Sequence, residues 1–214
     1  MRIDRYIEIR NCQKEFAYSI LDFEIEDGSL KRAGKTLGFL EGETLYFDDE
    51  EESNILMEYI LFEKNGKKNR LIDRYHTSCF SELSTTEQMI LEGMQNSIYS
   101  IYKVIECKPE RSSSKIYDLV GKKEYELIDI NMSQSASVGL LLATRLVPIE
   151  DMYITSGLIF AFEPQRQLRL LTEISKSRPK KRKISIKPKK STSKTLLEIM
   201  HDANKKWGME VKMS

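Results

Sequence analysis

Short runs rich in β-branched and aromatic residues fill residues 97–164, and polar or turn-forming residues separate them. The runs are Tyr99–Ile105, Ile116–Val120, Tyr125–Ile130, Leu140–Val147 and Met152–Phe162. Such residues suit a pleated, half-buried surface, so each run predicts a β-strand. Ser156-Gly157 inside the last run predicts a β-bulge. The closely spaced strands favour an antiparallel meander that curls into a small barrel or a covered sheet.

The fourth run has an alternative interpretation. Val138–Leu146 could form a helix, because periodicity alone does not separate a short buried strand from a buried helix. Turn residues on both sides, Gly139 and Pro148, favour the strand. The small residues Ser133–Ser137 before it are expected to form a loop whose hydroxyls cap backbone groups.

Apolar residues at helical spacing dominate the part of the chain before residue 97. Phe16, Ile20 and Phe23 share one face of a helix expected over Glu15–Glu26. Tyr6–Arg10, earlier in the chain, fits a strand or the end of a loop.

The sequence indicates the N-termini of two later helices. The acidic run Asp48–Glu52 precedes apolar residues at helical spacing and indicates a helix N-terminus, where negative charge complements the helix dipole. A divalent-metal site or a dock for a basic partner is the alternative for that run. Ser84 or Thr85 with Glu87 indicates a capped helix that leads directly into the first strand.

The chain after Pro164 predicts two more helices, over Gln165–Ser175 and Thr195–Trp207. Thr195 with Glu198 matches a capping box, and Gly208 is a suitable stop. A helix this short is marginal alone, so we expect it to dock on the body of this protein or on a partner. The expected docking residues are Leu196, Leu197, Met200 and Trp207.

The pattern as a whole predicts an α+β protein, with a helical N-terminal half packed on the small β-meander or barrel. The expected regions are 1–96, mainly helical; 97–164, antiparallel β; 165–194, a helix and a basic linker; and 195–208, the docking helix.

Charge is divided unevenly along the 214 residues, although the net charge is only +1. Residues 1–173 hold 21 Lys/Arg and 30 Asp/Glu, a net of −9, whereas residues 174–214 hold 13 and 3, a net of +10. An acidic body therefore carries a basic tail. Its expected nucleic-acid-binding residues are Lys180, Lys181, Arg182, Lys183, Lys187, Lys189 and Lys190.

Such a tail can neutralise several phosphates of RNA or DNA. Its Lys/Arg stretch, Lys176–Lys194, contains no aromatic residues, so we expect no base stacking and little sequence preference. An acidic protein surface is the other expected partner, and the protein's own Asp48–Glu52 is the alternative.

The sequence contains no established catalytic signature: no GxSxG, phosphate-binding glycine loop or HExxH. Side chains that an enzyme could use are Asp73, His76, Asp118, Asp129, Ser133, Ser135, Ser137 and Arg145. His76 and Cys79 near Asp73 could suggest a nucleophile or a metal site, but plain packing or capping is the favoured explanation. We therefore predict no catalytic residues, no metal site and no cofactor.

The three cysteines are widely spaced and form no CxxC pair, which favours a reducing, cytoplasmic setting over a disulfide framework. No apolar stretch approaches the roughly 20 residues that span a bilayer, so we expect no membrane partner.

Several segments resemble an uncharacterised group of bacterial proteins: ILDFEIEDGS, LGFL, NRLIDRYH, LSTTEQMIL, DINMSQSASVGLLLATRLVP and ITSGLIF. The resemblance covers roughly residues 17–163. It implies a helical half followed by a β-rich half that contains a VGLxLAxR segment. Some members of the group end in a Cys-rich SEC-C zinc tail. This chain has a Lys/Arg tail and no CxC there, so the resemblance implies no metal.

The sequence thus predicts a non-enzymatic binding or adaptor protein that contacts nucleic acid through its tail. The alternatives are an assembly module that docks through its C-terminal helix, and an enzyme of unknown reaction.

Overall fold

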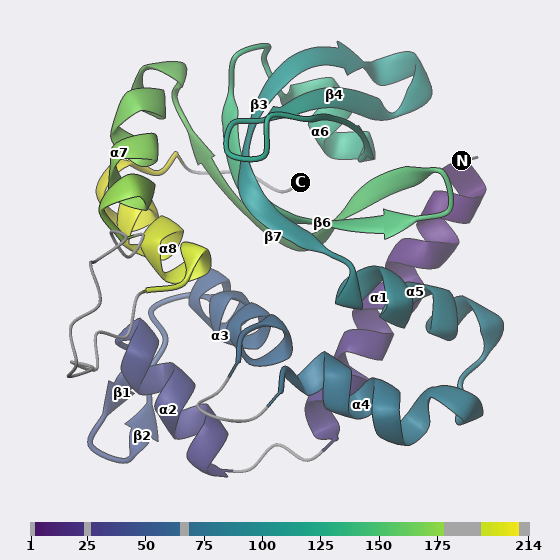
Figure 1. Ribbon diagram of the computed structural model, residues 1–214, viewed down its shortest axis with the longest axis vertical. Helices are drawn as coiled ribbons and strands as arrows, with labels where there is room; N and C mark the ends of the chain where they lie inside the picture. Colours follow the sequence, from purple (N-terminus) through teal and green to yellow (C-terminus); the bar gives the residue numbers. More distant parts are fainter. Residues whose placement is uncertain (1–2, 24–26, 65–68, 178–193, 210–214) are drawn as a thin grey trace, which may run out of the picture.

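The computed structural model describes residues 3–23, 27–64, 69–177 and 194–209, and it confirms the α+β class. Strands of the second half close into a barrel, and the helices of the first half form a layer against one side of it (Figure 1). The N-terminal elements are α1 (Ile3–Asp22), α2 (Asp27–Leu37), α3 (Glu50–Phe62), α4 (Leu71–Cys79) and α5 (Thr85–Gln95), with a small hairpin of β1 (Leu40–Glu41) and β2 (Thr44–Leu45) after α2.

Helix α1 corrects the expectation that Tyr6–Arg10 is a strand or the end of a loop. Its buried positions include Tyr6, Ile9, Phe16 and Ile20, which recur at three, four and seven residues along one helix face. The pattern was obscured because Gln13 occupies a buried position between them, and because the exposed Ile7 breaks the polar face.

The helix starts predicted at the acidic run and at Ser84 are present. Asp49 is the N-cap of α3 and its carboxylate accepts a hydrogen bond from Glu52 N, at 2.9 Å. The acidic run therefore begins a helix, as expected. Ser84 and Glu87 form a complete capping box at the start of α5.

The barrel consists of β3 (Ile98–Lys108), β4 (Ser113–Asp118), β5 (Glu124–Ile128), β6 (Leu141–Ile149) and β7 (Met152–Phe162), in the closed order β3-β4-β5-β7-β6. All neighbouring pairs are antiparallel except β5 and β7, which meet in parallel at Leu127 and Tyr153. The parallel pair was not expected, and it arises because α6 (Ile130–Ser135) and β6 intervene between the two strands. The register shifts opposite Ser156-Gly157, where the bulge was predicted, and Gly157 has φ +119°.

Helix α6 also corrects part of the prediction that Ser133–Ser137 is a loop, because Ser133–Ser135 are helical whereas Ala136 and Ser137 are not. Asp129 caps the helix by accepting a hydrogen bond from Met132 N. The Ser133 and Ser135 hydroxyls donate to carbonyls three and four residues earlier, so these serines bond their own backbone as expected, but within a helix.

Two apolar clusters hold the fold together. One fills the barrel and includes Tyr102, Val104 and Leu127. The other joins the helices to the outer face of β6 and β7, from which Val147, Phe160 and Phe162 project. The helices and the outer face of the barrel therefore share one core, and the barrel interior forms a second.

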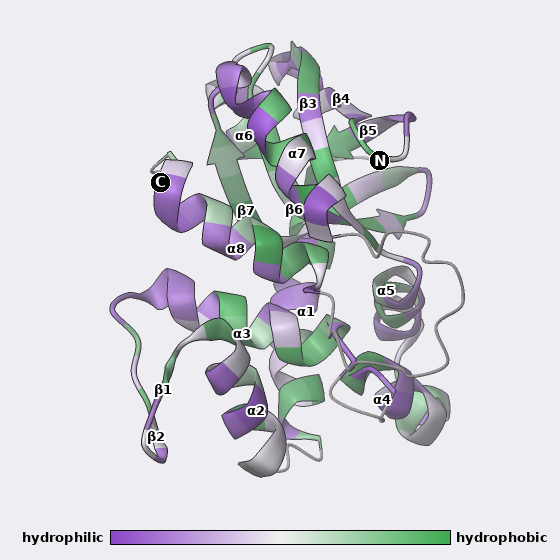
Figure 2. Ribbon diagram, turned by 60° about the vertical axis from the view of Figure 1, so that its left-hand side comes forward, coloured by the Kyte–Doolittle hydropathy of each residue, from purple (hydrophilic) through white to green (hydrophobic). Residues whose placement is uncertain are grey.

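Helices α7 (Gln167–Ser177) and α8 (Leu196–Trp207) pack against each other, and α8 also contacts β7 and β3. Figure 2 shows the two helices beside the barrel, with hydrophilic and hydrophobic residues alternating along α8. Leu197, Met200 and Ala203 are buried, which is the packing expected of an amphipathic helix.

Candidate functional site

The seven basic residues predicted to bind nucleic acid, Lys180, Lys181, Arg182, Lys183, Lys187, Lys189 and Lys190, lie outside the described residues. The segment that contains them is attached to the body at both ends, because α7 precedes it and α8 follows it. At its two edges Lys176 pairs with Glu173 at 2.8 Å, and Lys194 pairs with Asp202. The basic stretch is therefore an insertion between two docked helices, and not a terminal tail.

The C-terminal helix docks on the protein's own body, one of the two expected possibilities. Leu197 and Met200 have no exposed surface, and Leu196 and Trp207 are partly buried against the same cluster. The body thus covers Leu197 and Met200 fully and Leu196 and Trp207 in part. His201, also on α8, lies between the rings of Phe39 and Phe160, and burial together with nearby Lys205 lowers the pKa of this imidazole.

The acidic run at the start of α3 contacts the C-terminal end of α8. Glu51 accepts a hydrogen bond from Asn204 at 3.2 Å, and Glu52 lies 3.8 Å from Lys205. The opposite end of α8, where the basic segment joins, lies beside the C-terminal half of α3, because the Tyr59 hydroxyl contacts Glu198. The two helices therefore run antiparallel, and the acidic run contacts α8 about 12–14 Å along the helix from its first residue, Leu196.

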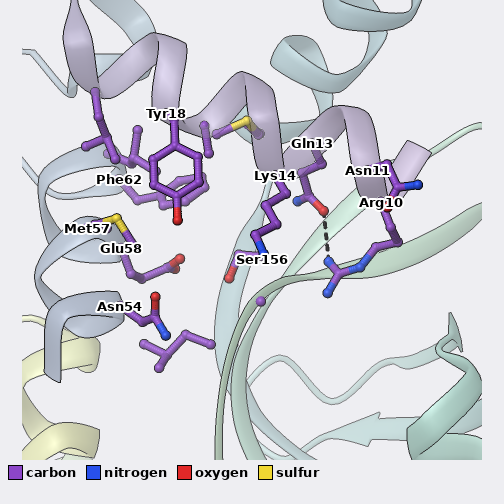
Figure 3. Close-up of a pocket in the computed structure, with 16 residues that line it drawn as sticks. Arg10, Asn11, Gln13, Lys14, Tyr18, Asn54, Met57, Glu58, Phe62 and Ser156 are labelled. Atoms are coloured by element: carbon purple, nitrogen blue, oxygen red, sulfur yellow. Dashed lines mark hydrogen bonds between the residues drawn. The ribbon is translucent and has the colours of Figure 1, made fainter. Parts of the chain in front are cut away.

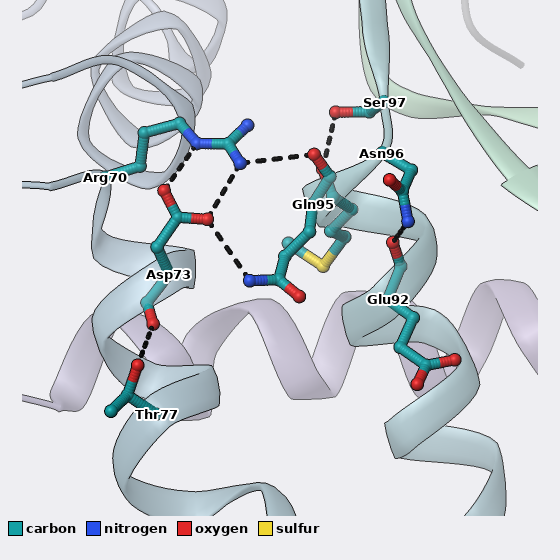
Figure 4. Close-up of polar contacts among 8 residues, drawn as sticks. Arg70, Asp73, Thr77, Glu92, Gln95, Asn96 and Ser97 are labelled. Carbon is teal, nitrogen blue, oxygen red and sulfur yellow. Dashed lines mark hydrogen bonds and ion pairs between the residues drawn. The ribbon is translucent and has the colours of Figure 1, made fainter.

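Asp73, His76 and Arg145 do not come together into one site. Asp73 accepts two hydrogen bonds from Arg70, at 2.7 and 2.8 Å, and one from Gln95 at 3.2 Å (Figure 4). Burial by itself would raise the pKa of Asp73, but the bonds from Arg70 and Gln95 outweigh it and the pKa is lowered. His76 stacks on Phe80 with ring centroids 4.4 Å apart. This part of the enzyme hypothesis therefore finds no support in the geometry.

Two further enzyme candidates, Asp118 and Asp129, bind backbone N–H groups of a turn and of a helix start. Asp118 is buried, and one of its oxygens accepts from the Ser100 hydroxyl at 2.6 Å and from the backbone N–H groups of Val120 and Gly121. Asp129 caps α6. Ser137 is exposed and lines a cavity beside α6.

Arg145 lies in a buried ion cluster that the sequence did not indicate. Its Nε donates to Glu58 at 2.6 Å and its Nη2 donates to Glu63 at 3.2 Å. The guanidinium also lies over the Phe62 ring, 4.1 Å from the centroid. Burial, more than the nearby Glu58, raises the pKa of Glu63, while Arg145 opposes the shift. The partners are 82 and 87 positions away from Arg145, so no local pattern could have revealed them.

A cavity of about 330 Å³ lies between α1, α3 and the β7 bulge. Figure 3 shows Lys14 and Tyr18 of α1 facing Glu58 of α3, with Ser156 between the two helices. Glu58 is at the buried floor, whereas Lys14 and Tyr18 are exposed at the rim. Arg10 is bound to Gln13 at 2.8 Å and to the Thr155 carbonyl at 2.7 Å. The α1 side of the cavity is therefore fixed by contacts within the protein.

A second cavity, of about 730 Å³, lies between α1, α6 and the inner side of β6 and β7. Its apolar residues include Leu142, Ile159 and Ala161, and its polar rim includes Asp129 and Ser137. This mixture is typical of a site for an apolar ligand held by a few polar groups.

Within residues 3–23, 27–64, 69–177 and 194–209, no group of three His, Cys, Asp or Glu side chains is placed to hold a metal ion. None of the helices in the same ranges has the length and apolar character that crossing a membrane requires.

Comparison with known proteins adds one positive finding. No curated protein and no solved structure matches the chain. A model described as a family of unknown function, DUF7986, matches residues 1–214. The chain therefore belongs to the family of unknown function DUF7986.

Proposed function

We propose that this protein is a non-enzymatic binding or adaptor protein that contacts RNA or DNA through the basic segment between α7 and α8. One observation carries the proposal: residues 178–193 contain eight Lys or Arg and no Asp or Glu, and helices packed on the body flank this segment on both sides. Helices α7 and α8, which border the segment, pack against each other, and α8 also contacts β7 and β3. The body supplies stability, and the segment supplies the contact with phosphate.

The expected affinity is electrostatic. Each phosphate that a Lys or Arg neutralises releases condensed counterions, so binding weakens steeply as salt rises. The segment has no aromatic side chain on which a base could stack, so sequence preference is expected to be small. The body has the opposite charge, because residues 1–173 carry a net of −9. The body would repel a polyanion, which concentrates the contact on the segment.

The barrel topology points to nucleic acid by analogy, but on a different face. The closed order β3-β4-β5-β7-β6 is the strand order of OB barrels. As in those barrels, the third and fifth strands, β5 and β7, are parallel, and a helix, α6, lies between the third and fourth strands. Many OB barrels bind oligonucleotides on the face of their second and third strands. A shared fold alone does not establish function. Here that face carries paired charges, including Lys115–Glu124 at 2.7 Å and Lys108–Glu126 at 3.8 Å, so the basic segment is the stronger candidate.

A charge-neutralised variant tests the proposal. Substitution is preferable to deletion, since the segment joins two packed helices. The seven residues changed to Gln are Lys180, Lys181, Arg182, Lys183, Lys187, Lys189 and Lys190. The matched control changes four barrel lysines to Gln: Lys103, Lys115, Lys122 and Lys123. Fluorescence polarisation with labelled single-stranded RNA and duplex DNA, measured over a series of salt concentrations, reports affinity and salt slope.

We expect the segment variant to bind at least about tenfold more weakly, and its salt slope to fall by about 0.7 to 0.9 for each phosphate that is no longer neutralised. The barrel variant should bind nearly as well as the unmodified protein. Equal affinity of the unmodified protein and the segment variant would show that the proposal is wrong. Weaker binding by the barrel variant alone would also refute it, since the contact would then lie on the OB-like face.

A further inference from the structure

The bulge in β7, the buried ion cluster and the cavity between α1 and α3 meet at one place in the fold. The register of β6 and β7 shifts at Arg145, where residues 156–158 of β7 lie opposite it. Bulges change the direction of the side chains that they carry. Ser156 of the bulge lines the cavity of about 330 Å³, and so does Glu58, which binds Arg145. This α1–α3 cavity therefore borders both a buried charge and an irregular stretch of backbone.

The floor of the α1–α3 cavity has more carboxylate than guanidinium charge. Arg145 binds Glu58 at 2.6 Å and Glu63 at 3.2 Å, so one cation faces two carboxylates. Glu58 is buried, and among the described residues only one of its oxygens accepts a hydrogen bond. Figure 3 shows the Glu58 carboxylate directed into the space between α1 and α3. A buried carboxylate with an available oxygen is stabilised by a cation that donates hydrogen bonds, such as an ammonium group.

Two more polar groups at the α1–α3 cavity are available to a ligand. The Ser156 hydroxyl is buried, and it has no hydrogen-bond partner in the described part of the chain. Lys14 is exposed at the rim, and it forms no ion pair with the residues that the structure describes. In Figure 3 the Lys14 side chain points from α1 toward Ser156. A buried hydroxyl without a partner is unfavourable, and a ligand carboxylate could accept from it and pair with the neighbouring cation.

Much of the remaining lining of the α1–α3 cavity is apolar. It comes from α1, α3, α5 and β7 and includes Leu21, Met57, Leu61, Met94 and Leu158. The volume of about 330 Å³ lies at the lower end of the roughly 300–1,000 Å³ that is typical of small-molecule sites. The cavity is therefore suited to a small molecule that combines an apolar part with charged groups.

We propose that the α1–α3 cavity binds a free amino acid with an apolar side chain, such as leucine or phenylalanine. The ammonium group donates to Glu58 at the floor, the carboxylate binds Ser156 and Lys14, and the side chain contacts the apolar lining. A zwitterion matches both charges of the cavity, whereas an amine or an acid alone matches one. The proposal is independent of the nucleic-acid contact, which is assigned to residues 178–193.

Titration of the full chain with L-leucine and L-phenylalanine, by isothermal calorimetry, tests the proposal. Two analogues of leucine each lack one charged group: isopentylamine lacks the carboxylate, and 4-methylpentanoate lacks the amine. The NMR amide shift of Gly157 reports whether a ligand reaches the bulge, because this residue lines the cavity. We expect both amino acids to shift the Gly157 amide. Each analogue should bind at least about tenfold more weakly than L-leucine, the loss expected for one hydrogen-bonded charged group.

Three variants locate the contacts. Glu58→Gln should weaken binding of L-leucine at least about tenfold, and Ser156→Ala about threefold to tenfold. Lys14→Gln should weaken binding of L-leucine about threefold but strengthen binding of isopentylamine, because Lys14 repels an amine that has no carboxylate. Lys35→Gln is the matched control for Lys14→Gln, since Lys35 is also exposed on a helix but does not line the cavity.

Circular dichroism checks the fold of each variant. Ser156→Ala and Lys14→Gln remove no hydrogen bond or ion pair of the described residues, so they test the proposal even where Glu58→Gln unfolds. The proposal is wrong where neither amino acid, at millimolar concentration, produces heat or shifts the Gly157 amide. Equal affinity for isopentylamine and L-leucine would also overturn it, because the site would then recognise only a cation. So would equal weakening by Lys14→Gln and Lys35→Gln.

Discussion

Replacing Arg145 with methionine is the most informative perturbation of the folded body. The Arg145 side chain is 6% exposed and its partner Glu58 is 5% exposed, so both charges are removed from water. Glu63, 20% exposed, completes the cluster. Met fills most of the volume of the Arg side chain but provides no charge and no donors. The substitution therefore leaves two carboxylates in the core without their common cation.

Removing one partner of a buried pair typically costs about 3–5 kcal/mol, because an uncompensated charge stays buried. The stacking of the guanidinium on Phe62 is removed as well, and it contributes up to about 2 kcal/mol when desolvated. We expect the free energy of unfolding to fall by about 4 kcal/mol at neutral pH, a large part of the roughly 5–15 kcal/mol typical of a domain.

The destabilisation should depend on pH with a definite sign. Burial already raises the pKa of Glu63 in the unmodified protein, and Arg145 opposes that shift. Without Arg145, the folded-state pKa of Glu63 rises further above its unfolded value. A group whose pKa is raised on folding stabilises the fold below its unfolded pKa, and that stability is lost as pH rises through the folded pKa. The variant should therefore recover stability as pH falls from about 7.5 to about 5.

Urea unfolding followed by circular dichroism at both pH values measures the effect. The control combines Arg145→Met with Glu58→Met and Glu63→Gln, which removes the buried charges together and should regain most of the stability. A cost of less than about 1 kcal/mol at neutral pH would contradict the reasoning, and so would a cost that does not change with pH.

Two further substitutions have expected effects of known sign. Gly93→Ala should lower the free energy of unfolding by about 2 kcal/mol in urea unfolding, because the new Cβ would lie 2.4 Å from the Pro148 carbonyl oxygen and 3.1 Å from Val147. This cost would exceed the usual preference of Ala for a helix. Unchanged stability would show that α5 can move away from β6. Asp118→Ala should lower the free energy of unfolding by about 3 kcal/mol in the same assay, because the Ser100 hydroxyl and two backbone N–H groups lose their acceptor. A decrease of less than about 1 kcal/mol would indicate that water replaces the carboxylate.

The strands and caps could be predicted because their causes are local. The runs of β-branched and aromatic residues in residues 97–164 correspond to β3–β7. Asp49, Ser84 and Thr195 act on backbone groups three residues away, so each cap can be recognised within one helical turn. The expectation failed at Tyr6–Arg10 and at Ser133–Ser137, where a buried Gln13 and a run of serines imitate irregular structure.

Other features depended on which distant segments meet. The sequence alone determined the α+β class, the strand runs, the helix starts and the separation of an acidic body from a basic segment. Only the tertiary structure decided the parallel β5–β7 pair, the cluster of Arg145 with Glu58 and Glu63, the docking of α8 on its own body and the cavity beside β7. The physical reason is range: propensity and capping act over a few residues, whereas burial and charge pairing act between residues that only the folded chain brings into contact.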